Sequence, residues 1–172
     1  INGNGVVVSS KNQGAIKNTG YINRWTGAIT LGSASTIVST GTSSLTTVDS
    51  LILESGAINL STYILTTDVV KGMRIDGVIT GTGGITKISN DTLILGGTNT
   101  YTGLTTLSAG VIEAKNSAAF GTNAGATTMT SGTTIQIEGS GLVIPEPITI
   151  NGNGVVVNAA NQGAIKNTRY IN

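Results

Sequence analysis

Apolar residues along the chain stand either at every second position or in short runs of two to four. The alternation is clearest in residues 85–88 and 134–137, where isoleucine alternates with threonine, lysine or glutamine. A period of two indicates a half-buried strand, and a period of 3.6, typical of a helix, is nowhere sustained. Residues 114–120 suit one helical turn, too short to be stable alone. The pattern predicts strands at 5–8, 14–17, 27–31, 36–39, 45–48, 51–54, 57–60, 63–66, 73–75, 77–80, 85–88, 92–95, 105–107, 111–114, 127–130, 134–138, 142–144 and 148–150.

A segment of 23 residues occurs twice. Residues 1–23 and 150–172 are identical at 19 of 23 positions, which sets a period of 149 residues. We therefore expect residues 1–149 to be one unit of a tandem array, residues 150–172 to begin the next unit, and the chain to be part of a longer protein. Three consecutive differences, at 9–11, predict an exposed turn. Val6–Val8 recurs unchanged, which predicts a buried strand.

Composition helps to choose among the all-β folds. Many short strands fit a sandwich, a barrel or a solenoid. Tandem repetition favours open-ended stacking, and an aromatic content of 3% with a charged content of 10% and 25 glycines suits a narrow aliphatic interior. The prediction is a β-solenoid of about six or seven coils per repeat, if a coil takes roughly 20–25 residues.

Charge and residue types exclude several classes of protein. A formal net charge of +1, with scattered Lys and Arg, gives no basis for nucleic-acid binding. No apolar stretch approaches the roughly 20 residues of a transmembrane helix. The chain has no cysteine and no histidine, so disulfides, the usual nucleophile–base pairs and typical zinc sites are excluded. We expect no catalytic residue, metal or cofactor.

Residues 81–112 resemble the autotransporter-associated β-strand repeat, also called the passenger-associated transport repeat. The resemblance depends on a glycine-rich start, an apolar-Thr-Lys sequence, a Thr-Leu-x-Leu strand and an Asn-Thr-Tyr-x-Gly turn. The chain departs from the family at 89–91, where the family usually has glycines. The matching positions are Gly83, Gly84, Ile85, Lys87, Thr92, Leu93, Leu95, Gly97, Asn99, Tyr101, Gly103, Thr105, Ala109 and Gly110.

This resemblance implies a right-handed parallel β-helix in the exported passenger of a bacterial autotransporter, displayed at the cell surface or outside the cell. The residues themselves indicate structural roles. Leu93 and Leu95 are expected to point inward and Thr92 outward. Asn99 is expected to bond its own neighbouring backbone and to stack with asparagines of other coils. Tyr101 is expected to cover the apolar column with its hydroxyl in solvent.

Two surface features are candidate binding residues. Asp68, Lys71, Arg74 and Asp76 form the densest polar cluster, which is either a saccharide or anion contact or a solvated loop whose charges compensate. Trp25 either stacks on carbohydrate or packs as a cap on a coil. None of the eight carboxylates has another within three residues, although stacking of coils could bring distant ones together.

The leading functional hypothesis is a non-enzymatic structural or adhesive segment of a long extracellular β-helical fibre. Its expected partners are neighbouring repeats or like subunits joined head to tail, and surface glycans or other cells. The alternatives are a polysaccharide-active β-helix enzyme and an ice- or glycan-binding solenoid. Irregular spacing of threonine between coils counts against an ice-binding face.

Overall fold

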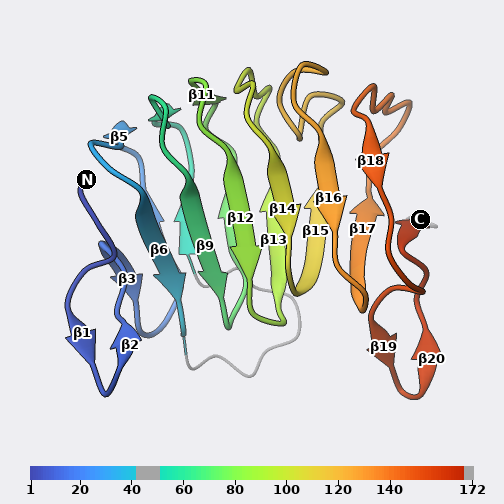
Figure 1. Cartoon of the computed structure of the whole chain (residues 1–172), viewed down its shortest axis with the longest axis horizontal. Coiled ribbons are helices and arrows are strands. Elements are labelled where there is room, and N and C mark those ends of the chain that lie inside the picture. Colours follow the sequence, from blue (N-terminus) through green and yellow to red (C-terminus); the bar gives the residue numbers. More distant parts are fainter. Residues whose placement is uncertain (42–50, 169–172) are drawn as a thin grey trace.

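A computed structural model describes residues 1–41 and 51–168 of the chain. It is an all-β solenoid of about six turns, whose strands stack in parallel along one long axis (Figure 1). The expected fold class and number of coils are thereby confirmed. No helix occurs in the residues described, and 117–120 form a turn.

Two seven-stranded parallel sheets face each other across the core. Sheet 1 consists of β3 (Ile16–Asn18), β6 (Ser35–Ser39), β9 (Leu65–Val69), β12 (Ile85–Ile88), β14 (Thr105–Leu107), β16 (Thr127–Met129) and β18 (Ile148–Thr149). Sheet 2 consists of β4 (Asn23–Trp25), β7 (Leu51–Leu53), β10 (Met73–Ile75), β13 (Thr92–Leu95), β15 (Gly110–Ala114), β17 (Thr133–Ile137) and β21 (Ile165–Asn167). A short third sheet holds β5 (Ile29–Thr30), β8 (Ile58–Asn59) and β11 (Ile79–Thr80).

The core is one column of aliphatic side chains. Register keeps equivalent positions together: Ile85 of β12 pairs with Leu65 of β9 and with Thr105 of β14, each 20 residues away. Leu93 and Leu95 are fully buried, whereas Thr92 and Ile94, which alternate with them along β13, are half-buried. The alternation of buried and outer positions therefore confirms the inward direction expected for the two leucines.

Glycines allow the coils to turn tightly at the corners. A Cβ on Gly77 would lie 2.1 Å from the carbonyl oxygen of Gly56 in the preceding coil. A Cβ on Gly103 would lie 2.3 Å from the carbonyl oxygen of Gly83. Backbone of one coil thus packs directly on backbone of the next, which requires residues without side chains at these positions.

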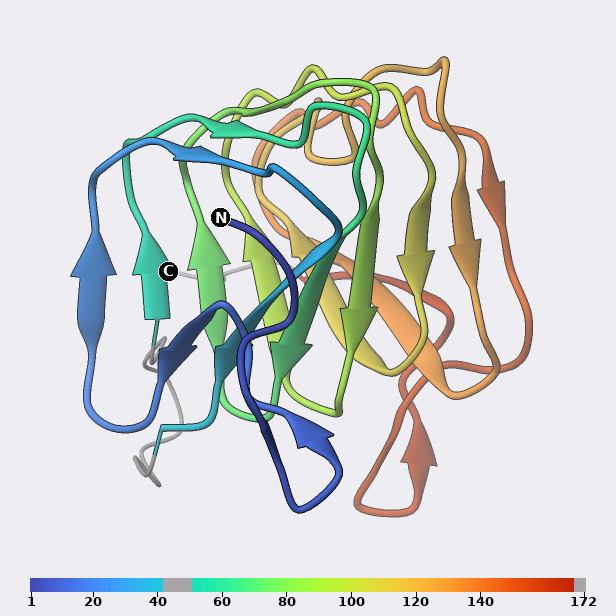
Figure 2. The ribbon, with the colours of Figure 1, turned by 60° about the vertical axis from the view of Figure 1, so that its left-hand side comes forward.

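The two copies of the repeated segment form the same β-hairpin. β1 (Val7–Val8) pairs with β2 (Lys11–Asn12), and β19 (Val156–Val157) pairs with β20 (Ala160–Asn161). Both two-residue turns have positive φ at each position, at Ser9 and Ser10 in the first copy, as a type I′ hairpin requires. The exposed turn predicted at 9–11 is confirmed at Ser9 and Ser10, whereas Lys11, also exposed, begins β2. Figures 1 and 2 show both hairpins projecting from the stack.

Some strand predictions were wrong. Val6–Val8 is not buried: its side chains are 55–70% exposed, because the hairpin extends away from the column and no layer covers it. Residues 142–144 form no strand, since Pro145 and Pro147 follow directly and cannot donate to a ladder. β4 and β2 were not predicted because their sequences are polar. The strand expected at 45–48 lies outside the described residues.

Candidate functional site

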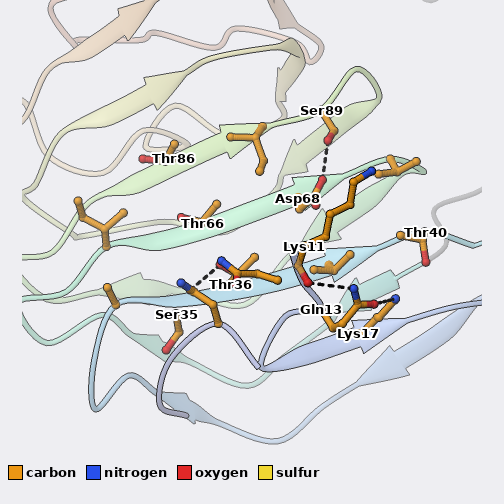
Figure 3. Close-up of a pocket in the computed structure, with 17 residues that line it drawn as sticks. Lys11, Gln13, Lys17, Ser35, Thr36, Thr40, Thr66, Asp68, Thr86 and Ser89 are labelled. Atoms are coloured by element: carbon orange, nitrogen blue, oxygen red, sulfur yellow. Dashed lines mark hydrogen bonds between the residues drawn. The ribbon is translucent and has the colours of Figure 1, made fainter. Parts of the chain in front are cut away.

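A groove of about 840 Å³ lies on the outer face of sheet 1 (Figure 3). One side is formed by Lys11, Gln13 and Lys17, from the first hairpin and β3, and the floor by the outward-facing residues of β6, β9 and β12. The hairpin therefore creates the groove, because it overhangs a sheet that would otherwise be open.

Threonines form a row along this face. The six residues that pair successively across sheet 1 are Thr36, Thr66, Thr86, Thr106, Thr128 and Thr149. Their sequence spacing is irregular, yet they are in register, because differences in coil length are absorbed at the corners. The expectation that threonines are irregularly spaced between coils was therefore wrong for this row, because strand pairing aligns them. The parallel row two residues further on holds Val38, Asp68 and Ile88, so the threonine row is single.

The polar groups of the groove are held in place by local bonds. Lys17 Nζ donates to Gln13 Oε1 at 2.5 Å, and Gln13 Nε2 donates to the Lys11 carbonyl at 3.1 Å. Opposite them, Ser89 Oγ donates to Asp68 Oδ1 at 2.5 Å. The groove thus offers two ammonium groups, one carboxylate and a row of hydroxyls. These are groups that hydrogen-bond a polar ligand without supplying a nucleophile–base pair.

The predicted surface candidates are not gathered in one place. Asp68 lines the groove. Arg74 and Asp76 lie on and next to β10 in sheet 2, where Arg74 Nε donates to Asp76 Oδ2 at 2.7 Å. Lys71 lies in the turn between β9 and β10. Trp25, on β4, is 45% exposed and donates from Nε1 to the Gly27 carbonyl at 2.8 Å.

Sequence reasoning missed the groove residues Lys11, Gln13, Lys17 and the threonine row. A signal was present: nearly every sheet 1 strand has threonine as its second residue, preceded by an aliphatic, serine or threonine. Aligning the coils on that position would have placed the threonines together. The hairpin overhang has no comparable signal in the sequence.

Two turn residues of the repeat motif join neighbouring coils. Asn99 is buried; its Oδ1 accepts from Ile79 N at 2.9 Å and its Nδ2 donates to the Ala119 carbonyl at 2.7 Å. The expected bond to its own neighbouring backbone was wrong, because both side-chain bonds go to other coils. The expected asparagine stack was wrong, because the adjoining coils have isoleucine and alanine there. Tyr101 is fully buried with its hydroxyl 2.6 Å from Thr105 Oγ1. The sequence analysis had placed this hydroxyl in solvent, and that prediction was wrong.

Lys87 of the same motif is also fully buried. Its Nζ donates to the carbonyls of Ile88, Ser89 and Ala109, the last at 2.9 Å. Burial lowers the pKa of Lys87 to about 8, and the nearby Asp91 and Asp68 partly oppose this shift. The lysine thus closes a corner between two coils through its hydrogen bonds.

This buried lysine gives a pH-dependent prediction. Between pH 8 and the unfolded value of 10.5, Lys87 is neutral when folded and charged when unfolded. The unfolded state then binds more protons, so the free energy of unfolding rises with pH across this window, by on the order of 3 kcal/mol at most. Urea denaturation at pH 7, 9 and 10 should show this rise relative to Lys87→Met. If the difference in the free energy of unfolding between the parent protein and Lys87→Met stays constant with pH, this prediction is wrong.

Glu113 and Glu138, on neighbouring coils, both form ion pairs with Lys115. Lys115 Nζ lies 3.1 Å from Oε1 of Glu113 and 3.1 Å from Oε1 of Glu138. Burial raises the pKa of Glu113, and Lys115 opposes that shift. In residues 1–41 and 51–168, no group of three or more acidic side chains is arranged to hold a metal ion.

Comparison with known proteins gives one match. Residues 85–114 match the family described as passenger-associated-transport-repeat, which is a repeat family rather than an enzyme family. This match and the solenoid fit a repeat of an autotransporter passenger, as the resemblance had indicated, and the family implies a secreted or cell-surface protein. No curated protein and no solved structure matches the chain. None of the described segments is a helix long and apolar enough to cross a membrane.

Proposed function

We propose that this chain is a non-catalytic structural segment of an autotransporter passenger, forming part of an extended fibre outside the cell. The observation that carries the proposal is the family match at 85–114, on coils whose motif side chains serve stacking. Leu93 fills the column, Asn99 joins three coils, and Lys87 closes a corner. Residues with these roles build length rather than chemistry.

Exposure on intact cells tests this proposal. An epitope tag inserted at the exposed turn at Ser9–Ser10 in the parent protein should be stained by antibody on unpermeabilised cells. It should also be removed by externally added protease. A periplasmic marker protein that stays protected in the same cells is the control. Staining that appears only after the outer membrane is permeabilised would overturn the proposal.

A second candidate function, saccharide binding, is favoured by the groove. We propose that the hydroxyls of Thr66 and Thr86, with the ammonium of Lys17, contact a polar glycan there. A glycan array should then detect binding by the chain and a loss of at least tenfold in the double variant Thr66→Val and Thr86→Val. Thr128→Val, on the same row but outside the groove, should bind as the parent does. Absence of binding, or equal binding by all three proteins, would exclude this function.

A further inference from the structure

The two copies of the repeated segment pack on the solenoid in different ways, although their sequences are nearly the same. In the first copy β3 pairs with β6 in sheet 1, and in the second copy β21 pairs with β17 in sheet 2. In both pairings the isoleucine of the repeated segment is opposite an isoleucine that follows a threonine. Ile16 is opposite Ile37, and Ile165 is opposite Ile135. One segment thus fits two places.

The place occupied by residues 1–18 is here called the N-terminal seat, and residues 32–40 form it. Gly32 N donates to the Ile1 carbonyl at 2.8 Å, and Gly3 N donates to Ser33 Oγ at 2.7 Å. Thr36 Oγ1 donates to Asn4 Oδ1 at 2.7 Å, and Thr36 O accepts from Ala15 N at 2.7 Å. Thr40 N donates to the Asn18 carbonyl at 2.9 Å. These contacts extend over the whole length of the seat.

Every residue that makes these contacts is unchanged in the second copy. The equivalents of Ile1, Gly3, Asn4, Ala15, Ile16 and Asn18 are Ile150, Gly152, Asn153, Ala164, Ile165 and Asn167. The four differences between the copies fall at 9–11, in the turn and at the start of the second strand of the hairpin, and at position 20. Residues 150–168 therefore carry all the groups that the N-terminal seat binds.

The second copy buries less of its apolar surface where it lies. Ile150 and Ile165 are 47% and 44% exposed, while Ile1 and Ile16 pack against the core. In the second copy it is Ala164 that packs against the core instead. Ile165 is opposite the buried Ile135 and so lies on the core side of sheet 2, but β21 is the outermost strand of that sheet and leaves this side chain half-exposed. In the N-terminal seat the equivalent residues, Ile1 and Ile16, are partly buried.

We propose that residues 150–168 of one chain bind the N-terminal seat of a second copy of this chain, in place of that copy's residues 1–18. The contact is head to tail and leaves the same two surfaces available at the ends of the pair, so it extends to open chains of molecules. Residues 1–18 of the receiving chain compete from within their own molecule. Association of the unaltered protein therefore rises with concentration.

A matched pair of alanine variants tests the exchange. Ile16→Ala weakens the resident segment and leaves the donor intact, so the mass-average size in light scattering should rise at least twofold at equal concentration. Ile165→Ala removes the same side chain from the donor, where it is half-exposed. The double variant should return to the size of the unaltered protein. If the Ile16→Ala variant is no larger than the parent, or if the double variant stays as large as Ile16→Ala, the proposal fails.

Cysteine cross-linking tests the geometry independently, since the chain has no cysteine of its own. Lys17 is opposite Val38 in the seat, and Lys166 is its equivalent in the second copy. Val38→Cys combined with Lys166→Cys should give disulfide-linked dimers and longer species on a non-reducing gel. Val38→Cys combined with Val143→Cys, at a position 70% exposed outside the segment, is the control. Equal yields of linked species from the two variants would contradict the exchange.

Discussion

Replacing Asn99 by alanine is expected to destabilise the solenoid by roughly 2–5 kcal/mol, since two buried backbone groups lose their partners together. The side chain of Asn99 satisfies Ile79 N in the preceding coil and the Ala119 carbonyl in the following coil. Alanine cannot bond either group, and water has little access, because the position is 2% exposed. Each unsatisfied buried group costs about 1–3 kcal/mol.

Urea denaturation followed by circular dichroism measures this effect. Asn90→Ala is the matched control, because Asn90 lies in another turn of the same motif and is exposed. The control should change the free energy of unfolding by less than about 0.5 kcal/mol. If both variants unfold at the urea concentration of the unaltered protein, Asn99 does not join the coils.

Replacing Leu93 by alanine is expected to cost about 2–5 kcal/mol, through lost burial and through the cavity that remains. Leu93 is fully buried in the column, between Met73 of one coil and Ile112 of the next. The stacked backbones limit collapse of the coils into the cavity, because register holds them at a fixed spacing. The cost should therefore fall in the upper part of the range.

The neighbouring residue provides the control for this cavity. Ile94 lies on the same strand with its side chain toward the outer face, where it is only half-buried. Ile94→Ala removes as many carbon atoms as Leu93→Ala but leaves no cavity in the column. It should therefore lower the free energy of unfolding clearly less than Leu93→Ala. Thermal unfolding monitored by circular dichroism can rank the two variants. The inward direction of Leu93 would be wrong if Ile94→Ala proved the more destabilising.

Local patterns in the sequence were sufficient for the fold class and for much of the core. Alternation on a strand assigns a face to each residue without reference to any other part of the chain, and Leu93 and Leu95 were placed correctly on that basis. The turn at 9–11 was predicted because three consecutive substitutions there are tolerated. The family motif could be recognised because its order of residues is local as well.

The roles of individual turn residues depend on neighbouring coils, and the sequence near them carries no information about those coils. Asn99 bonds to residues 20 positions away in both directions, and Tyr101 is buried by coils stacked around it. A local pattern suggested a self-contained turn for the first and a solvent-facing hydroxyl for the second. Both inferences were wrong for this reason.

By itself, the sequence determined that this protein forms short strands, that an aliphatic column fills its interior, and that one segment of 23 residues occurs twice. Only the tertiary structure decided with which sheet and which coil each copy pairs. Ile16 packs against the core and Ile165 stays half-exposed, because the receiving strand lies in the following coil for one copy and in the preceding coil for the other. Register between coils likewise aligned threonines whose spacing in the chain is uneven, and this long-range pairing is not encoded by any single stretch of residues.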